Sequence, residues 1–571
     1  MLRLLGILIL VVIGIAAAFG CLVLTLAHAP WWTYILVTVP VWFPVGVWYA
    51  VAKLGIPAFL KVAIEVMLIA IVAFTCLALG GTPAWTWVVL EGMVGLAVIL
   101  WALRMAVERR LVYVKTPLNL LLILLVLYIF FQLVPMPAGI LRSFQPNTLR
   151  VYTVGLPQVR EAASEPLQDG TSYPLSLNRW STREHLFLYM AYVGFFLVFL
   201  NNMTGRQQLG RMLGVLVALG AIVAIAGFST LRQDERLLYR WFPVGGANEK
   251  PAFLNADTNP EFSAGYGFVF GVQEGDATDF YVPKVHGGDV FGGFPSSNSA
   301  ATVLVMVLLV ALGVFFAYIS TRRDEWGGSG GLLYTREGNI TLLVFFVAAL
   351  LVYGLGISRS RGGIVVLVAL LPVLVLLVAF SRSLLAGIIT VVVVALLLVT
   401  PLAVVGRSPA IDFLSEKAAV WLNPWQEDVR FLGRESAWLI AGDFPLFGTG
   451  LGTFASVYPA YKIHGPVLYF AHCDLLQWMA EMGLVGMILG GAILLTGLWT
   501  VIVGWFRLKD PFFRRLLLGS ALGCVAFLAH GLVDFPLQIP GVVIIFVTLA
   551  AVSIVVARDR VARHEERDFI F

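Results

Sequence analysis

Charged residues and cysteines are both scarce in this sequence, and each shortage excludes a class of protein. Only 12% of the 571 residues are charged, whereas an average soluble domain contains about 25%. Of the four cysteines, Cys21, Cys76 and Cys524 lie inside apolar runs, where they act as small hydrophobic side chains. The cysteine spacing fits neither a disulfide framework nor a zinc site. These shortages exclude a large soluble domain and a disulfide-rich module.

The sequence also lacks internal repeats and a continuous face of lysine and arginine residues. The chain shows no heptad pattern and no convincing internal repeat. Its formal net charge is +5, but lysine and arginine cluster between apolar runs and not along one face, so we expect no nucleic-acid partner. We also expect no cofactor and no metal, because the possible ligands match no standard ligand spacing. Those ligands are His464, His472, Cys473 and Asp474.

Hydrophobic residues make up 60% of the chain, and its mean hydropathy is +0.91. Apolar runs of about 20 residues, the length that crosses a membrane as a helix, recur from end to end. We interpret the first run as a span and not as a cleaved signal peptide, because it exceeds the usual apolar core of about 7–15 residues. The sequence therefore predicts an all-α, polytopic transmembrane helix bundle with about fourteen spans. The predicted spans are 4–27, 30–52, 58–80, 84–107, 117–135, 184–201, 207–228, 298–320, 340–357, 362–380, 384–404, 475–506, 515–534 and 541–557.

Breaks rich in lysine and arginine determine the expected orientation. With alternating spans these breaks fall on one side, which the positive-inside rule assigns to the cytoplasm together with both termini. The opposite side receives three long loops, which we expect to be helical because long loops without structure of their own are uncommon. In the last loop, the apolar stripe of Phe431, Trp438 and Leu439 indicates an amphipathic helix.

The expected organisation follows from these boundaries. In chain order it comprises N-terminal transmembrane helices (1–135), a loop on the side opposite the cytoplasm (136–183), transmembrane helices (184–228), a second loop on that side (229–297), transmembrane helices (298–404), a large third loop on that side (405–474), C-terminal transmembrane helices (475–557) and a cytoplasmic tail (558–571).

Arg359 and Arg361 lie in the short turn 356–363, between two apolar spans on the side opposite the cytoplasm. Charged groups at membrane depth are costly and usually face a cavity or a partner. Guanidinium groups match phosphate oxygens, and the glycines of the turn allow a bulky ligand to approach the backbone. The turn therefore predicts a phosphate-bearing lipid headgroup as ligand, with snorkelling to bulk lipid headgroups as the alternative.

Several polar residues gather where the last long loop re-enters the membrane. Asp474, Gln477 and Glu481 recur at helical spacing and predict a polar stripe that faces a cavity. His472 lies just before this helix, where backbone N–H groups and the helix dipole favour an anion. A hydrogen-bonded structural histidine is the equal alternative.

His530 and Asp534 lie one helical turn apart at the outer end of another span. The carboxylate would either fix the tautomer of the imidazole or, together with it, only stabilise the helix end. The residues alone favour the second, structural role. Arg434 in the last loop would by itself be an ordinary arginine paired with Glu435 or Asp443.

Four motifs follow one another in the C-terminal half: Ser358–Gly363, Gly448–Gly452, His472–Gln477 with Glu481 and Gly483, and His530–Pro540. In this order, on a many-span protein with a large outer loop, they resemble the bacterial O-antigen ligase and O-antigen polymerase family over roughly residues 340–545. The segment Phe294–Asn298 lies where that family often carries an aromatic residue and an asparagine. Cys473 departs from the family, which often has asparagine there.

The resemblance implies a GT-C-like, metal-independent glycosyltransferase of the bacterial inner membrane. Its active site would face the periplasm and move a glycan from undecaprenyl diphosphate to a hydroxyl of lipid A core or another glycan acceptor. By position, Arg361, Arg359 and Arg434 would hold the donor diphosphate, and His472 would act at the acceptor or the diphosphate. Asp474, Gln477, His530 and Asp534 complete the predicted substrate-binding residues.

Three alternatives stay open. Within the family, the protein could polymerise O-antigen or exopolysaccharide units or transfer an oligosaccharide to protein. A secondary transporter also suits the hydropathy, although transporters tend to show paired repeats and midplane charges, and here the charges gather at the outer interface. A scaffold for envelope assembly would not need the arginine turn.

Overall fold

The computed structural model of the protein describes residues 55–111, 113–154, 172–231, 291–321, 335–380, 429–462 and 468–558. The chain divides into two compact units: Met1–Met67 with Leu96–Tyr113, and Leu68–Gly95 with Val114–Phe571. In the described part of the first unit, Arg104 Nε lies 2.7 Å from Glu108 Oε1, one helical turn away. The second unit contains every candidate site residue.

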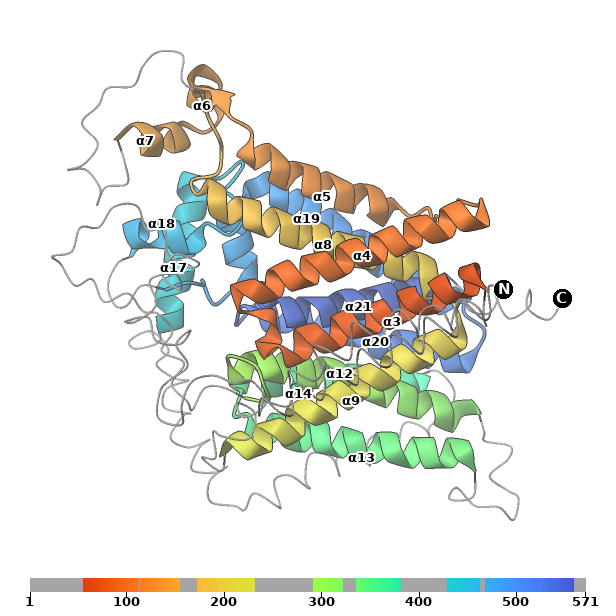
Figure 1. The fold of residues 1–571 in the computed structure, drawn as a ribbon. Helices are drawn as coiled ribbons and strands as arrows, with labels where there is room; N and C mark the ends of the chain where they lie inside the picture. Colours follow the sequence, from red (N-terminus) through yellow and green to blue (C-terminus); the bar gives the residue numbers. More distant parts are fainter. Residues whose placement is uncertain are drawn as a thin grey trace, which may run out of the picture. The chain divides into compact units, whose positions relative to one another are not determined.

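Helices dominate the described residues (Figure 1). Nine of these helices are long and apolar enough to cross a membrane: α3 (Ile56–Leu77), α4 (Ala84–Glu108), α8 (Arg179–Asn202), α9 (Arg206–Leu231), α12 (Ser297–Thr321), α13 (Arg336–Ile357), α19 (Asp474–Arg507), α20 (Pro511–Gly531) and α21 (Pro540–Ala557). Two further apolar helices are α5 (Pro117–Leu133) and α14 (Arg361–Phe380). The starts of α5 and α20 follow sequence signals, because Thr116 and Asp510 cap the first backbone N–H groups and a proline follows each.

The predicted spans can be compared with these helices one by one. Eleven of them coincide with the nine long and two further apolar helices. The other three, 4–27, 30–52 and 384–404, lie outside the described residues. The multi-pass helical architecture is therefore confirmed, whereas the total of about fourteen spans and the GT-C-like arrangement stay predictions.

Helix α12 forms the centre of the second unit. In its most apolar window 94% of the residues are buried, and it packs against α9, α13, α14, α20 and α21. Glycines bring α12 and α20 together, since a Cβ added to Gly313 would lie only 2.8 Å from Gly519 Cα. This close approach holds the beginning of α12 beside the end of α20, where the candidate site lies.

Short elements lie beyond the ends of α5, α8 and α19 (Figure 1). They are β1 (Met136–Pro137), α6 (Ala138–Phe144), α7 (Pro146–Val154), β2 (Ser172–Tyr173), α17 (Val429–Asp443) and α18 (Phe454–Tyr461). The strands pair antiparallel, with Met136 opposite Tyr173. Helices were expected in the long loops and are present in the described parts of 136–183 and 405–474, whereas residues 232–290 of the loop 229–297 lie outside the described residues. The strand pair was not predicted.

Helix α17 has two different faces. Its Ala437 and Ile440 are fully buried and pack against α18 and α19. The apolar stripe identified in the sequence lies on the opposite, outward face: Phe431, Trp438 and Leu439 are 37%, 63% and 44% exposed. The helix is therefore confirmed, but Ala437 and Ile440 and not the stripe identified in the sequence attach it to the bundle.

Helix α19 is interrupted at Gly483, whose φ of 58° and ψ of −165° are not helical. The glycine-rich segment 448–452 packs against this kink, because the backbone N–H groups of Thr449 and Gly450 donate to the carbonyls of Ala480 and Glu481 at 3.0 and 2.9 Å. A short first helical segment is thereby separated from the long apolar part of α19. That first segment carries the polar stripe predicted from the sequence.

Gln132 of α5 joins the glycine-rich segment to α19. This fully buried amide donates from Nε2 to the carbonyls of Phe447 and Glu481, at 2.9 and 3.1 Å. Its Oε1 accepts a hydrogen bond from Leu451 N at 3.1 Å. One side chain therefore bonds to backbone groups of both segments, and it supplies the partner of the buried Leu451 N–H group.

The packing at the kink predicts that Gly448→Ala destabilises the protein by at least about 2 kcal/mol. Gly448 has a φ of 70°, and an added Cβ would overlap the Glu481 carbonyl group. The measurement is thermal unfolding of the detergent-solubilised protein, which should show a lower midpoint. Gly442→Ala in α17 is the matched control, because an added Cβ there meets nothing within 4 Å. It should leave the midpoint unchanged or raise it, and a wild-type midpoint for Gly448→Ala would contradict the packing argument.

Candidate active site

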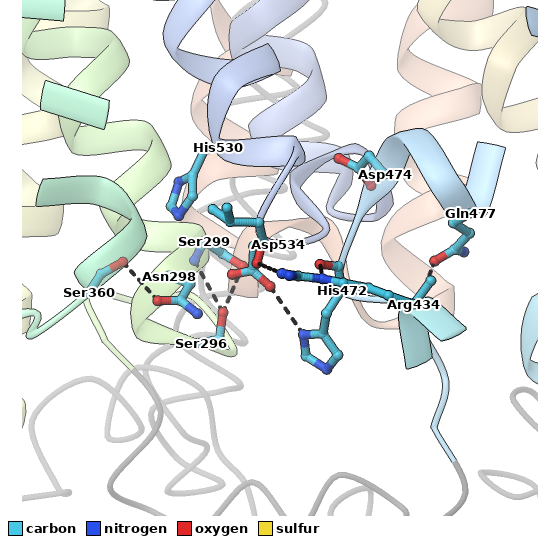
Figure 2. Close-up of polar contacts among 12 residues, drawn as sticks. Ser296, Asn298, Ser299, Ser360, Arg434, His472, Asp474, Gln477, His530 and Asp534 are labelled. Carbon is cyan, nitrogen blue, oxygen red and sulfur yellow. Dashed lines mark hydrogen bonds and ion pairs between the residues drawn. The ribbon is translucent and has the colours of Figure 1, made fainter. Parts of the chain in front are cut away.

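Helix ends from distant parts of the sequence meet at one end of the second unit. Figure 2 shows residues from the start of α12, the turn between α13 and α14, helix α17, the start of α19 and the end of α20. Two 3₁₀ turns, η1 (Leu79–Gly81) and η4 (Pro536–Gln538), close neighbouring connections. A Cβ on Gly80 would lie 2.7 Å from the Phe294 ring, which shows how closely these connections pack.

His472 and Asp534 form the central pair of this region. His472 Nδ1 lies 3.3 Å from Asp534 Oδ1, and the ring points toward the carboxylate from a different chain segment (Figure 2). The His472 side chain is 22% exposed, whereas that of Asp534 is 6% exposed. The Phe535 ring packs edge-on against the imidazole at 4.9 Å. With Nδ1–H assigned as donor to the carboxylate, Nε2 becomes an unprotonated acceptor.

Asp534 lies between α20 and η4, outside the candidate spans. Burial by itself raises the pKa of its carboxyl group. The hydrogen bond from His472 and the electrostatic interactions with His530, His472 and Arg430 outweigh burial, so that the pKa of Asp534 is below its ordinary value. Asp534 is therefore ionised at neutral pH and can hold the imidazole in one tautomer.

Arg434 connects the two segments that carry this pair. Its Nε donates to the His472 carbonyl at 3.1 Å, and its Nη2 donates to the Val533 carbonyl at 3.0 Å. His472 has a φ of 51°, a conformation that is uncommon for residues other than glycine, so its backbone needs such support. These two bonds use two of the five N–H donors of the guanidinium group. Both of these bonds go to backbone carbonyls and not to a carboxylate. Arg434 therefore retains further N–H donors that can bind a ligand.

The arginine turn has a regular alternation of buried and accessible residues. Ser358 and Ser360 are 4% and 1% exposed, whereas Arg359 is exposed and Arg361 is half-buried at the first position of α14. Ser358 Oγ donates to the Leu355 carbonyl at 2.7 Å and thereby closes the end of α13. The serines therefore fix the turn, and the charged side chains are left on its accessible side.

His530 is buried beside this turn. Thr302 Oγ1 donates to the Asn298 carbonyl at 2.9 Å, so we assign His530 Nδ1 as the donor to Thr302 Oγ1, at 2.6 Å. Nε2 is then an acceptor, and no described residue bonds to it. A Cβ added to Gly362 would lie 2.6 Å from this nitrogen, so the ring packs directly on the start of α14. His530 and Asp534 share one helix end, but they contact different partners.

The polar stripe of α19 faces the loop backbone. Asp474 Oδ2 accepts from Leu537 N at 2.8 Å, and Gln477 Oε1 accepts from Ala471 N at 3.0 Å. These two side chains are 8% and 2% exposed. The expected cavity in front of the stripe is therefore filled by chain, and substrate contact by these residues stays a prediction.

Glu481, the third member of the stripe, is 1% exposed. Its carboxylate accepts from Gly452 N at 2.8 Å and from Phe454 N at 3.0 Å. Two of its acceptor positions are therefore used to hold the glycine-rich segment in place.

A metal centre was not expected here. Among the described residues, no group of three or more His, Cys, Asp and Glu side chains is placed to hold a metal ion. His464, one of the ligands considered from the sequence, lies outside the described part of the chain.

Two features of the site were missed by the sequence interpretation. Arg430 contributes positive charge at Asp534 and lies one helical turn before Arg434, so its spacing on α17 was an available signal. The contacts of the Thr302 and Ser360 hydroxyls were the second, although hydroxyl groups near the beginning of strongly apolar helices indicate capping or a polar contact. No local pattern indicated which distant residues they would meet.

The lowered pKa of Asp534 gives a prediction about stability and pH. Because its folded-state pKa is below the unfolded value of about 3.9, the stabilisation from the ionised form is complete above that pH and is lost as the pH falls through the folded-state pKa. Thermal unfolding of wild type and Asp534→Asn should therefore give a midpoint difference that is constant from about pH 8 to about pH 5 and shrinks below about pH 4. A difference that widens on acidification would contradict the assignment of Asp534 as the ionised partner.

Comparison with known proteins adds one family. Residues 346–489 match the family model described as O-antigen ligase. No curated protein matches the chain. The matched region contains the arginine turn, Arg434, the glycine-rich segment and His472, whereas His530 and Asp534 follow it. Residues 346–489 of this multi-pass membrane protein are therefore similar to the O-antigen ligase family.

Proposed function

We propose that the protein is a glycosyltransferase that moves a glycan from undecaprenyl diphosphate to an acceptor hydroxyl, as an O-antigen ligase does with lipid A core. The observation that carries the proposal is the His472–Asp534 pair, whose two segments are held together by Arg434. The family match over 346–489 supports the general reaction class. The arginine turn, joined to the same helix ends through Gly362 and His530, supports a donor with a diphosphate group.

His472 takes the role of general base in this proposal. Asp534 accepts the Nδ1–H of His472, which leaves the Nε2 lone pair for the acceptor hydroxyl. The hydroxyl oxygen attacks the anomeric carbon of the donor and forms the new glycosidic bond. The bond from that carbon to the diphosphate oxygen breaks, the proton moves to Nε2, and the lipid diphosphate leaves with the electron pair. The configuration at the anomeric carbon inverts.

The arginines stabilise the leaving group. Negative charge builds up on the diphosphate oxygen as its bond to carbon breaks, and preorganised cations in a site with little water stabilise such charge strongly. Arg361 and Arg359 lie on the accessible side of their turn, and Arg434 retains donors beyond the two that hold the backbone. These three guanidinium groups supply the charge that the leaving group needs.

The proposed orientation places this site at the periplasmic face of the bacterial inner membrane, with both termini in the cytoplasm. Clusters of lysine and arginine between the opposite helix ends support this orientation. The donor lipid would then approach from the outer leaflet and present its diphosphate at the level of the helix ends.

The alternative functions within the family differ in the molecule that accepts the glycan. A polymerase of O-antigen or exopolysaccharide would use a second lipid-linked unit as acceptor, and a protein O-oligosaccharyltransferase would use a protein hydroxyl. A secondary transporter is disfavoured by the polar network at the helix ends, because transporters tend to bind their substrates near the midplane of the membrane. An assay with purified donor and each acceptor class separates these functions.

His472→Ala should lower kcat by about 100-fold to 10,000-fold, because the acceptor loses its base. Asp534→Asn should lower kcat by about 100-fold or more, because an amide no longer fixes the imidazole tautomer.

Arg361→Ala and Arg434→Ala should each lower the rate by about 100-fold or more through weaker stabilisation of the leaving group. The measurement is glycan transfer from a purified lipid diphosphate donor, with correct membrane insertion confirmed for each variant.

Arg142→Ala is the matched control, since Arg142 is an exposed arginine of α6 and contributes no contact to the site described above. It should transfer glycan at the wild-type rate. Wild-type rates for all of the His472, Arg361 and Arg434 variants would end the proposal. A loss of activity in Arg142→Ala equal to that in Arg361→Ala would show that the loss reflects general charge and not the site.

A further inference from the structure

The beginning of α12 carries a polar segment that the proposed mechanism does not use. Ser296 precedes the helix, and its Oγ accepts a hydrogen bond from Ser299 N at 3.1 Å, which caps the first turn. Asn298 lies in this turn and is half-buried, although the helix that follows is the most buried span among those described. A polar amide at this position reaches the same helix ends as the candidate active site.

Asn298 is joined directly to the arginine turn. Ser360 Oγ donates to Asn298 Oδ1 at 2.7 Å, and Figure 2 shows the two side chains facing each other between α12 and the start of α14. Ser360 Oγ also accepts a hydrogen bond from Gly363 N at 3.3 Å. Ser360 lies between Arg359 and Arg361, so this contact ties the backbone of both arginines to α12.

The contact also fixes the orientation of the amide. With the amide oriented so that Oδ1 faces Ser360, the Ser360 hydroxyl donates its one hydrogen to Oδ1 and accepts from Gly363 N. The two N–H donors of Asn298 Nδ2 then point away from Ser360. Within the described part of the chain, no residue accepts a hydrogen bond from Nδ2.

The surroundings of these donors favour an anion. Asn298 and Arg361 lie in the first turns of α12 and α14, where backbone N–H groups carry partial positive charge. Arg361 itself adds a full positive charge next to the Ser360 tether. An amide with two available N–H donors in this setting matches a phosphate oxygen, which accepts hydrogen bonds and is repelled by carboxylates.

We propose that Asn298 is a donor-binding residue: its carbonyl oxygen holds the arginine turn through Ser360, and its amide N–H groups bind a phosphate oxygen of the lipid diphosphate. This inference rests on the proposed function and assigns a specific recognition role to α12, which lies outside the matched family region. The arginines then provide charge, and Asn298 provides a directed hydrogen bond that orients the diphosphate.

Asn298→Asp tests the inference most sharply. The carboxylate keeps an oxygen for Ser360 but replaces both N–H donors with a negative charge, so the KM for the lipid diphosphate donor should rise at least about tenfold. Asn298→Ser is the neutral companion variant, which removes the amide donors without adding charge and should raise the same KM less steeply. The measurement is initial-rate kinetics of glycan transfer at varied donor and saturating acceptor, with thermal unfolding as the check on folding.

Asn178→Asp is the matched control. Asn178 caps α8 through Oδ1, a role that aspartate also fills, and its Nδ2 donates to Ser456 Oγ at 2.8 Å. This variant adds the same charge elsewhere and should keep the wild-type KM for the donor.

The outcomes separate this inference from the proposed function. Raised donor KM in both Asn298 variants, with a wild-type value in Asn178→Asp, supports the inference. Wild-type donor KM in either folded Asn298 variant overturns it and leaves the proposed function intact. If the wild-type protein transfers no glycan from any lipid diphosphate, the proposed function fails and this inference fails with it.

Discussion

The double hydrogen bond from Arg434 to the His472 and Val533 carbonyls holds the candidate site together. Without it, the segment before α19 and the segment after α20 would lose the two hydrogen bonds by which Arg434 bridges them, and His472 would lose support for its positive φ. Hydrogen bonds that involve a charged group contribute about 1.5–3 kcal/mol, which is enough to favour one arrangement of two short connections. The distance between His472 and Asp534 depends on this arrangement.

From that junction, a continuous series of contacts runs across the helix ends. Asp534 follows His530 by one helical turn, His530 packs on Gly362, and Ser360 of the same turn bonds to Asn298. Backbone groups, small hydroxyls, His530 and Asp534 make the buried contacts of this series, whereas the guanidinium groups and His472 lie on the accessible side. The site therefore combines a rigid support with a few charged groups, as electrostatic catalysis requires, because preorganised groups need no rearrangement during the reaction.

The sequence predicted the elements better than the contacts. Membrane helices are long and apolar, so composition and length locate them, and all predicted spans within the described residues correspond to helices. The arginine turn and His472 stood out for the same reason, because polar groups beside apolar spans need an explanation. Contacts between residues such as Ser360 and Asn298, 62 positions apart, depend on how the helices pack. Periodicity also indicated that Gln477 belongs to a polar face, but not that loop backbone covers that face.

The most direct test of the central claim is an experimental structure of the protein with its lipid diphosphate donor bound in a membrane mimetic. The account predicts density for the diphosphate in contact with Arg361 and Arg434, with the anomeric carbon of the glycan on the side of His472 Nε2. A donor whose diphosphate lies away from both arginines, or whose glycan is separated from His472 by the bundle, would contradict the account.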